Sequence, residues 1–281
     1  MRKVINKILS LIRTFEKINH LEIDKNLKNK IRSTWVKVFF LKRYDSKNRE
    51  ANIVGFKVKF FDYWMLFFLF NEIFLNNDYY FVTENDSPFI IDCGSNIGMS
   101  IVYFKMLYPN SHIVAFEPEN ETYLCLKKNV KLNFMDSVTI HKAALSDKEG
   151  RIELFYDQEN AGSLIMSTKN ERISKQKQIV KASLLSKHIN KEVDFLKIDI
   201  EGAELEVMEE LSNTKKIRYI KQMVIEYHHH IVCGSDVFSK MLKLLENAGF
   251  GYQIESRSLK PLLREQFQDI LVYAYRKESI A

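Results

Sequence analysis

Apolar side chains recur at helical spacing near the start of the chain. The stripe consists of Val4, Ile5, Ile8, Leu9, Ile12, Phe15 and Ile18, and the basic residues Arg2, Lys3, Lys7, Arg13 and Lys17 lie largely off it. This pattern predicts a basic amphipathic helix. We favour docking of its apolar stripe on the rest of the protein. The alternative is that residues 1–20 contact an anionic membrane surface.

The pattern changes after this helix and again near residue 85. Phe56, Val58 and Phe60 alternate as in a strand, and Asp62 is placed to cap a helix that continues to about Leu75. The turn signal Asn-Asp-Ser-Pro at residues 85–88 then ends this aromatic segment. We therefore expect residues 1–85 to form a mainly helical N-terminal appendage and residues 86–281 to form the main domain.

From residue 88 onward, short apolar runs alternate with helical patterns, which is typical of βαβ units and a parallel sheet. The expected strands cover residues 89–93, 112–117, 138–143, 194–200, 220–227, 252–256 and 270–275, and the expected helices cover 99–107, 119–132, 203–211 and 237–248. Two extra strands, at 151–156 and 178–182, flank a polar loop at 158–176. Because no helix separates the last two strands, the final one is expected to be antiparallel. The predicted fold class is α/β, a doubly wound Rossmann-like sheet of seven strands.

The turn after the first expected strand reads Asp-Cys-Gly-Ser-Asn-Ile-Gly at residues 92–98 and leads directly into a helix. In open α/β sheets a ligand binds beyond the carboxyl ends of the strands, beside such a turn. Asn96 replaces the second glycine of a dinucleotide-binding turn, so no place for a pyrophosphate is evident. Glu117 lies 117 − 98 = 19 residues beyond Gly98, where an acid can accept hydrogen bonds from both ribose hydroxyls.

A nucleoside without phosphates points to S-adenosylmethionine as the cofactor, with Asp92 facing its amino-acid portion through water or through the turn. The alternative is an ordinary glycine turn between strand and helix, with Glu117 merely starting the next helix. The candidate cofactor-binding residues are Asp92, Gly94, Ser95, Asn96, Gly98, Ser100, Glu117, Pro118 and Ala144.

Acids and a histidine follow the strands expected at 194–200 and 220–227. The candidate catalytic residues are Asp199, Glu201, Glu226 and His228. If the two strands are neighbours, Asp199 can approach His228 and keep the imidazole oriented and basic. We interpret Glu204 as a helix cap. We predict no metal, and a metal site formed by Asp199, Glu226 and His228 is the less favoured alternative.

Five ordered segments, at residues 92–98, 116–118, 144–147, 197–204 and 225–228, resemble the motifs of the FkbM family of S-adenosylmethionine-dependent methyltransferases. The similarity extends from about Phe74 to the C-terminus, and its most distinctive piece is Lys-Ile-Asp-Ile-Glu-Gly-Ala-Glu at 197–204. The resemblance implies O-methylation, typically of sugar hydroxyls in polysaccharides or glycosylated natural products. The expected partner is therefore a sugar or glycan hydroxyl.

Charge is distributed unevenly along the chain. The formal charge is +6 overall. Residues 1–50 contribute 14 − 5 = +9, and the remaining residues contribute 28 − 31 = −3. An acidic main domain without a basic, aromatic-interleaved run argues against nucleic acid as a partner. An RNA methyltransferase, and a catalytically silent nucleoside-binding module of a glycan-assembly complex, are kept as rival hypotheses.

Three scattered cysteines indicate neither a disulfide framework nor a zinc motif. With no signal peptide and no spanning segment evident, we expect a cytoplasmic protein, held peripherally at the inner membrane face if residues 1–20 bind lipid.

Overall fold

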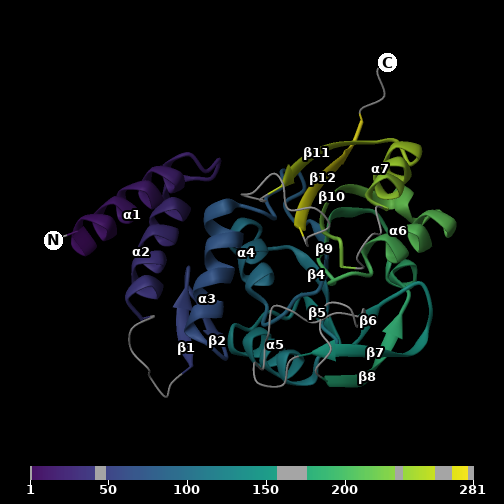
Figure 1. The fold of residues 1–281 in the computed structure, drawn as a ribbon, viewed down its shortest axis with the longest axis horizontal. Helices are drawn as coiled ribbons and strands as arrows, with labels where there is room; N and C mark the ends of the chain where they lie inside the picture. Colours follow the sequence, from purple (N-terminus) through teal and green to yellow (C-terminus); the bar gives the residue numbers. More distant parts are fainter. Residues whose placement is uncertain (1, 42–48, 157–175, 232–236, 257–267, 278–281) are drawn as a thin grey trace.

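The computed structural model describes residues 2–41, 49–156, 176–231, 237–256 and 268–277 (Figure 1). The polar loop expected at 158–176 lies, except for its last residue, outside these ranges. Within them the chain forms two small sheets, one large sheet and the helices that cover it.

The large sheet confirms the predicted fold class. Its strands are β3 (Phe89–Cys93), β4 (His112–Phe116), β5 (Val138–His141), β9 (Val193–Ile198), β10 (Ile220–His229), β11 (Phe250–Ser256) and β12 (Gln268–Arg276), in the spatial order β11-β12-β10-β9-β3-β4-β5. The five strands from β10 to β5 are parallel, and β12 is antiparallel to both β10 and β11. The order of the strands reverses at β3, so the tips of β3, β4 and β9 border one crevice.

Helices cover both faces of this sheet because its strands are apolar on both sides. Residues such as Ile90 and Phe195 face a core shared with α4 (Met99–Leu107) and α5 (Asn120–Leu132). Their neighbours Ile91 and Leu196 face the opposite core, which α6 (Glu204–Asn213) and α7 (Phe238–Asn247) complete. Burial on both faces is the arrangement that near-continuous apolar strands require.

The insertion before β9 forms a separate three-stranded sheet. It contains β6 (Ala144–Leu145), β7 (Gly150–Tyr156) and β8 (Gln176–Ser183) in the order β6-β8-β7. The third expected strand, at 138–143, ends two residues early, as β5 at His141, and β6 begins just beyond the expected range. Short 3-10 helices follow β8 at Leu185–His188 and precede β10 at Lys216–Tyr219.

The N-terminal residues add helices and a hairpin to one end of the main domain (Figure 1). The elements are α1 (Arg2–Asn19), α2 (Lys25–Leu41), a hairpin of β1 (Glu50–Ile53) and β2 (Phe56–Lys59), α3 (Tyr63–Phe70) and a π-helix at Asn71–Asn76. Asp62 caps α3 by accepting from the backbone N–H groups of Trp64 and Met65, as expected. The apolar side chains of this region and those of α4 share one core, in which Phe74 packs edge-on against Tyr103. The sequence analysis missed α2 and β1.

None of the helices in the described ranges combines the length and the apolar character needed to cross a bilayer.

Candidate active site

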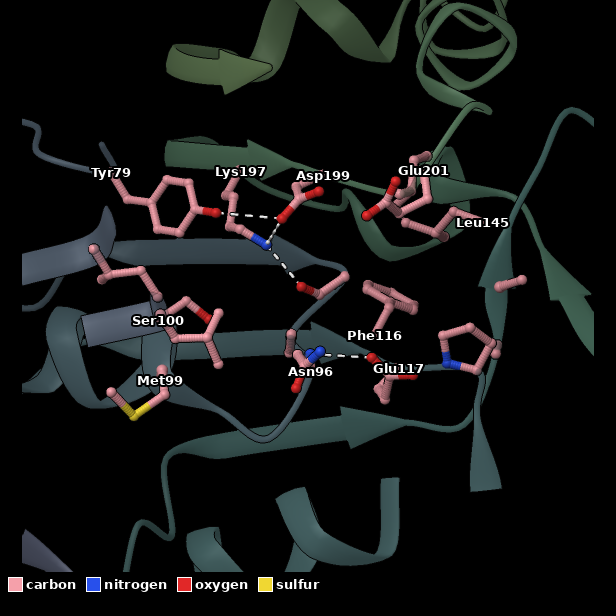
Figure 2. A pocket seen from close by; sticks show the side chains of 18 of the residues that line it. Tyr79, Asn96, Met99, Ser100, Phe116, Glu117, Leu145, Lys197, Asp199 and Glu201 are labelled. Carbon is pink, nitrogen blue, oxygen red and sulfur yellow. Dashed lines mark hydrogen bonds and ion pairs between the residues drawn. The ribbon is translucent and has the colours of Figure 1, made fainter. Parts of the chain in front are cut away.

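A cavity that opens to solvent lies at the carboxyl ends of β3, β4 and β9 (Figure 2). The glycine turn after β3 and the residues after β4 form one wall, which we call the turn wall. Asp199 and Glu201, which follow β9, belong to the opposite wall, which we call the acid wall and extend to Glu226 and His228 at the end of β10.

The turn wall is built mainly from backbone. The N–H groups of Gly94 and Ser95 both donate to the carbonyl of Phe116, which ties the turn to the end of β4. Gly94 has a φ of +83°, and a Cβ there would lie 1.8 Å from the carbonyl oxygen of Asp199. Only glycine allows the turn to pass this close to the end of β9. Gly98, with a φ of +92°, then begins α4.

Asp92 lies behind this turn and does not line the cavity. Its side chain is fully buried, accepts a hydrogen bond from Ser100 Oγ at 2.6 Å and lies 3.3 Å from Lys197 Nζ. Asp92 can therefore influence a ligand only through the turn, Ser100 or Lys197. It does not contact the ligand directly. Ser95, Asn96 and Ser100 do line the cavity.

Glu117 is the one acidic residue of the turn wall, and the backbone holds both of its oxygens. Asn96 N–H donates to Oε2 at 3.0 Å, and Glu119 N–H donates to Oε1 at 3.0 Å. Burial raises the pKa of Glu117 to about 8, because desolvation disfavours the charged form. Pro118 and Ala144 lie beside it on the same wall.

Asp199 follows β9 directly and faces the cavity, with 23% of its side chain exposed. Its Oδ2 accepts from Tyr79 Oη at 3.2 Å and lies 3.4 Å from Lys197 Nζ (Figure 2). Lys197 is buried and also donates to the carbonyl of Gly94 at 2.7 Å. Burial alone would lower the pKa of Lys197, but Asp92, Asp199 and Glu226 outweigh it and raise this pKa.

His228 lies at the end of β10 with three acids from the segment after β9. Its Nδ1 is 2.7 Å from Glu204, and its Nε2 is 3.1 Å from Glu201 and 3.9 Å from Asp199. Burial acts to lower the pKa of His228, but Glu201, Glu204 and Asp199 raise it well above its usual value. The expected approach of His228 to Asp199 is therefore confirmed, since β9 and β10 are neighbouring parallel strands.

The strand expected at 194–200 ends two residues early, at Ile198. Glu201 reaches the cavity from a turn, with a φ of +59°, and does not share a strand face with Asp199. Glu226 lies on β10 two residues before His228, so both point to the same face. Burial and then the neighbouring Asp199 raise the pKa of Glu226 well above its usual value.

Three residues of this site received no functional role in the sequence analysis. Lys197 had a usable signal, because a lysine inside the apolar run at 195–198 of a central strand must be paired. Glu204 accepts a local hydrogen bond from the backbone N–H of Gly202 at 2.8 Å and also contacts His228 at 2.7 Å, so its interpretation as a helix cap alone was incomplete. Tyr79 is 120 positions from Asp199, and no local pattern distinguished it from the aromatic core.

Comparison with known proteins gives the family. A model of the family described as Methyltransferase FkbM domain matches residues 92–252, which is more than half of the chain. Methyltransferase 1 from Beauveria bassiana (strain ARSEF 2860) is 31% identical over 216 residues, covering 69% of this chain and 84% of that relative. Methyltransferase sdnD from Sordaria araneosa is 28% identical over 215 residues, covering 65% of this chain and 81% of the relative.

Among solved structures, a methyltransferase FkbM from Methylobacillus flagellatus KT is similar over 96% of this chain and 60% of its own length, with a TM-score of 0.46 and 15% identity. The family match confirms the resemblance carried by the five sequence segments. The chain therefore belongs to the FkbM methyltransferase family, and S-adenosylmethionine is its methyl donor.

Proposed function

We propose that this enzyme transfers the methyl group of S-adenosylmethionine to a hydroxyl oxygen, and that the acceptor hydroxyl belongs to a sugar. The observation that carries the proposal is the meeting of Asp199, Glu201 and His228 at one wall of a cavity whose other wall carries Glu117. The side chains proposed to accept the hydroxyl proton thus lie opposite Glu117, the residue proposed to bind the ribose of the cofactor.

The turn wall has the chemistry that the cofactor requires. Backbone donors orient the Glu117 carboxylate, and its remaining lone pairs are available to ribose hydroxyls. Beside it, Ala143, Leu145 and Leu154 give the cavity an apolar patch on which an adenine can rest. The glycine turn lets the backbone of residues 94–98 approach the ligand closely.

The acid wall has the chemistry that a hydroxyl acceptor requires. S-adenosylmethionine supplies an electrophilic methyl group, and the protein has to align a hydroxyl with it and receive the hydroxyl proton. Asp199 and Glu201 line the cavity as hydrogen-bond acceptors, and His228 orients them from behind. We assign proton acceptance to this group of three.

The charges of the cavity support a neutral, hydroxyl-rich acceptor. Among its described lining residues, three are acidic and one is basic: Glu117, Asp199, Glu201 and Lys197. Lys197 is already engaged by Asp92 and Asp199, so the described lining residues offer no further cation for a phosphate. A sugar, whose hydroxyls donate hydrogen bonds to carboxylates, fits this lining better than a polyanion does.

The proposal is tested by incubating the purified protein with S-adenosylmethionine labelled in its methyl group and a panel of saccharides, with RNA and amine acceptors in parallel. We expect label in a saccharide, and nuclear magnetic resonance should place the new methyl on oxygen. Transfer to RNA or to an amine, with none to any saccharide, would overturn the proposed acceptor.

A further inference from the structure

Asp199, Glu226 and His228 form a cluster of metal-ligating side chains next to the cavity. One ligand atom from each residue can be chosen so that all three atoms lie within 4.8 Å of one another. Ligands of a single divalent ion, at about 2.1 Å from it, lie at most roughly 4.2 Å apart. Only one pair among three ligands can lie opposite each other, and the other pairs lie about 3 Å apart in an octahedral site, so the three groups close by up to roughly 2 Å to share an ion.

Outer partners already orient two of the three ligands. Glu204 holds Nδ1 of His228 at 2.7 Å, which leaves Nε2 to face Glu201, at 3.1 Å, and Asp199, at 3.9 Å. Tyr79 and Lys197 hold Oδ2 of Asp199, which leaves Oδ1 as the oxygen nearer to His228, at 3.9 Å from Nε2. A carboxylate behind a histidine, and hydrogen bonds behind a ligating carboxylate, are the usual outer supports of metal ligands.

Glu226, the third ligand, has no such support. It is half-buried at the end of β10, and it makes no hydrogen bond or ion pair with another residue in the described part of the chain. Lys197 and His228 lie near this carboxylate without forming an ion pair with it, so a cation bound beside Glu226 would compensate its charge more directly.

The same neighbourhood has an excess of negative charge. Five carboxylates lie around His228, and they belong to Asp199, Glu201, Glu204, Glu226 and Asp269. Among the described residues, Lys197 and His228 are the groups close to them that can carry positive charge, and Lys197 also pairs with a sixth carboxylate, that of Asp92, which leaves a formal excess of 6 − 2 = 4 negative charges. Partly buried like charges repel each other strongly, and a divalent cation relieves this repulsion.

We propose that Asp199, Glu226 and His228 bind a divalent cation of the Mg²⁺ and Mn²⁺ class, which holds the acceptor hydroxyl of the methyl-transfer reaction. The role in transfer rests on the function proposed above, whereas the ion site itself does not. Three protein ligands leave coordination positions open on the cavity side for hydroxyls of the acceptor, and two oxygen ligands with one nitrogen suit this class of ions.

The ion also changes the roles within the acid wall. A hydroxyl bound to it loses its proton more readily, and His228 acts as a ligand through Nε2. Glu201, which lines the cavity, then receives the proton. The acceptor oxygen forms its bond to the methyl carbon as the carbon–sulfur bond breaks, and the electron pair stays on sulfur as a neutral thioether. The products are thus the methyl ether, the neutral thioether and protonated Glu201, which account for the methyl group, the charge and the proton.

The site is tested with Mn²⁺ alone, by titrating it into metal-stripped, full-length protein and following the free ion by electron paramagnetic resonance. We expect saturation at one Mn²⁺ per chain. Glu226→Gln and His228→Gln, which preserve side-chain bulk, should lower the affinity at least tenfold. Glu204→Gln acts through His228 and should lower it 10- to 100-fold. Circular dichroism establishes that each variant is folded.

The matched control is Glu192→Gln. Glu192 is 65% exposed and pairs with Lys221, next to the first residue of β9 and at the other end of that strand from Asp199, so its Mn²⁺ affinity should equal that of the unmodified protein. Absence of saturable Mn²⁺ uptake, or uptake that folded Glu226→Gln and His228→Gln leave unchanged, overturns the inference.

Methyl transfer measured with and without a chelator separates this inference from the proposed function. Saccharide methylation that the chelator leaves unchanged overturns the role of the ion and supports the proposed acceptor. Saturable Mn²⁺ binding without saccharide methylation supports the site and overturns the acceptor.

Discussion

The two walls of the cavity are built on different principles. The turn wall uses backbone N–H groups, glycines and a single acid, Glu117, whose two oxygens the backbone already holds. The acid wall uses side chains from segments far apart in the chain, and its carboxylates converge on one imidazole. The turn wall has the features of a binding place for a fixed ligand, whereas the acid wall has those of a place where protons and charge change.

This difference predicts that binding and turnover can be separated by mutation. Changes at the turn wall should act on cofactor affinity, and changes at the acid wall should act on the rate of transfer. Tyr79, which supports the acid wall through one hydrogen bond to Asp199, should have a smaller effect that is confined to the rate.

The largest effect is expected for His228→Gln. Loss of the imidazole removes the group that orients Asp199 and Glu201, and general acid–base groups typically contribute about 10²- to 10⁴-fold to a rate. We expect kcat to fall by at least about 100-fold, with the dissociation constant of S-adenosylmethionine changed by no more than about twofold. Steady-state kinetics and calorimetry measure the two quantities, and a comparable loss of both would contradict the division between the walls.

The sequence allowed much of the turn wall to be predicted, because its features are local. A glycine turn between strand and helix requires positive φ at Gly94 and Gly98, and Glu117 stands at the tip of the next strand. The sheet was predicted for the same reason, since apolar runs and helical periodicity are read within a few residues. The antiparallel last strand followed from the missing helix before it.

The acid wall was predicted only in part, because long-range packing determines which acids meet. Asp199 and His228 stood out as polar ends of apolar strands. Glu204 has two roles, a local bond to Gly202 and a distant one to His228, and sequence spacing indicates only the first. Helix α2 was missed because no start signal or regular apolar stripe was recognised in residues 25–41.

The second largest effect is expected for Glu117→Ala, which should weaken S-adenosylmethionine binding by about 10- to 100-fold. The variant loses the hydrogen bonds that the ribose hydroxyls donate to the Glu117 carboxylate, and a hydrogen bond to a charged group is worth about 1.5–3 kcal/mol. It should leave the rate of transfer at saturating cofactor within a few-fold of normal. Calorimetric titration measures the affinity, and unchanged binding would show that Glu117 does not hold the ribose.

The third prediction concerns pH. Because burial raises the pKa of Glu117 to about 8, this residue is largely protonated in the free protein at pH 6, whereas ribose hydroxyls bind best to the carboxylate. Affinity for the cofactor should therefore rise with pH and level off above about pH 8, by at most about tenfold per pH unit. The same pH series of calorimetric affinities is measured on Glu117→Gln, which shows the part of the pH dependence that comes from the amino group of the ligand. Identical slopes of affinity against pH for the two proteins would exclude Glu117 as the cause.

The smallest effect is expected for Tyr79→Phe, which removes one hydrogen bond between the appendage and the acid wall. Tyr79 Oη donates to Oδ2 of Asp199 at 3.2 Å, while Lys197 continues to hold the same oxygen. A single such bond is worth about 0.5–1.5 kcal/mol, so the rate of transfer should fall roughly two- to tenfold. Cofactor affinity should be unchanged, because the ribose and adenine places lie on the opposite wall. If Tyr79→Phe weakens cofactor binding and leaves the rate intact, Tyr79 contacts the cofactor, and the boundary between the walls has to be moved to include it in the turn wall.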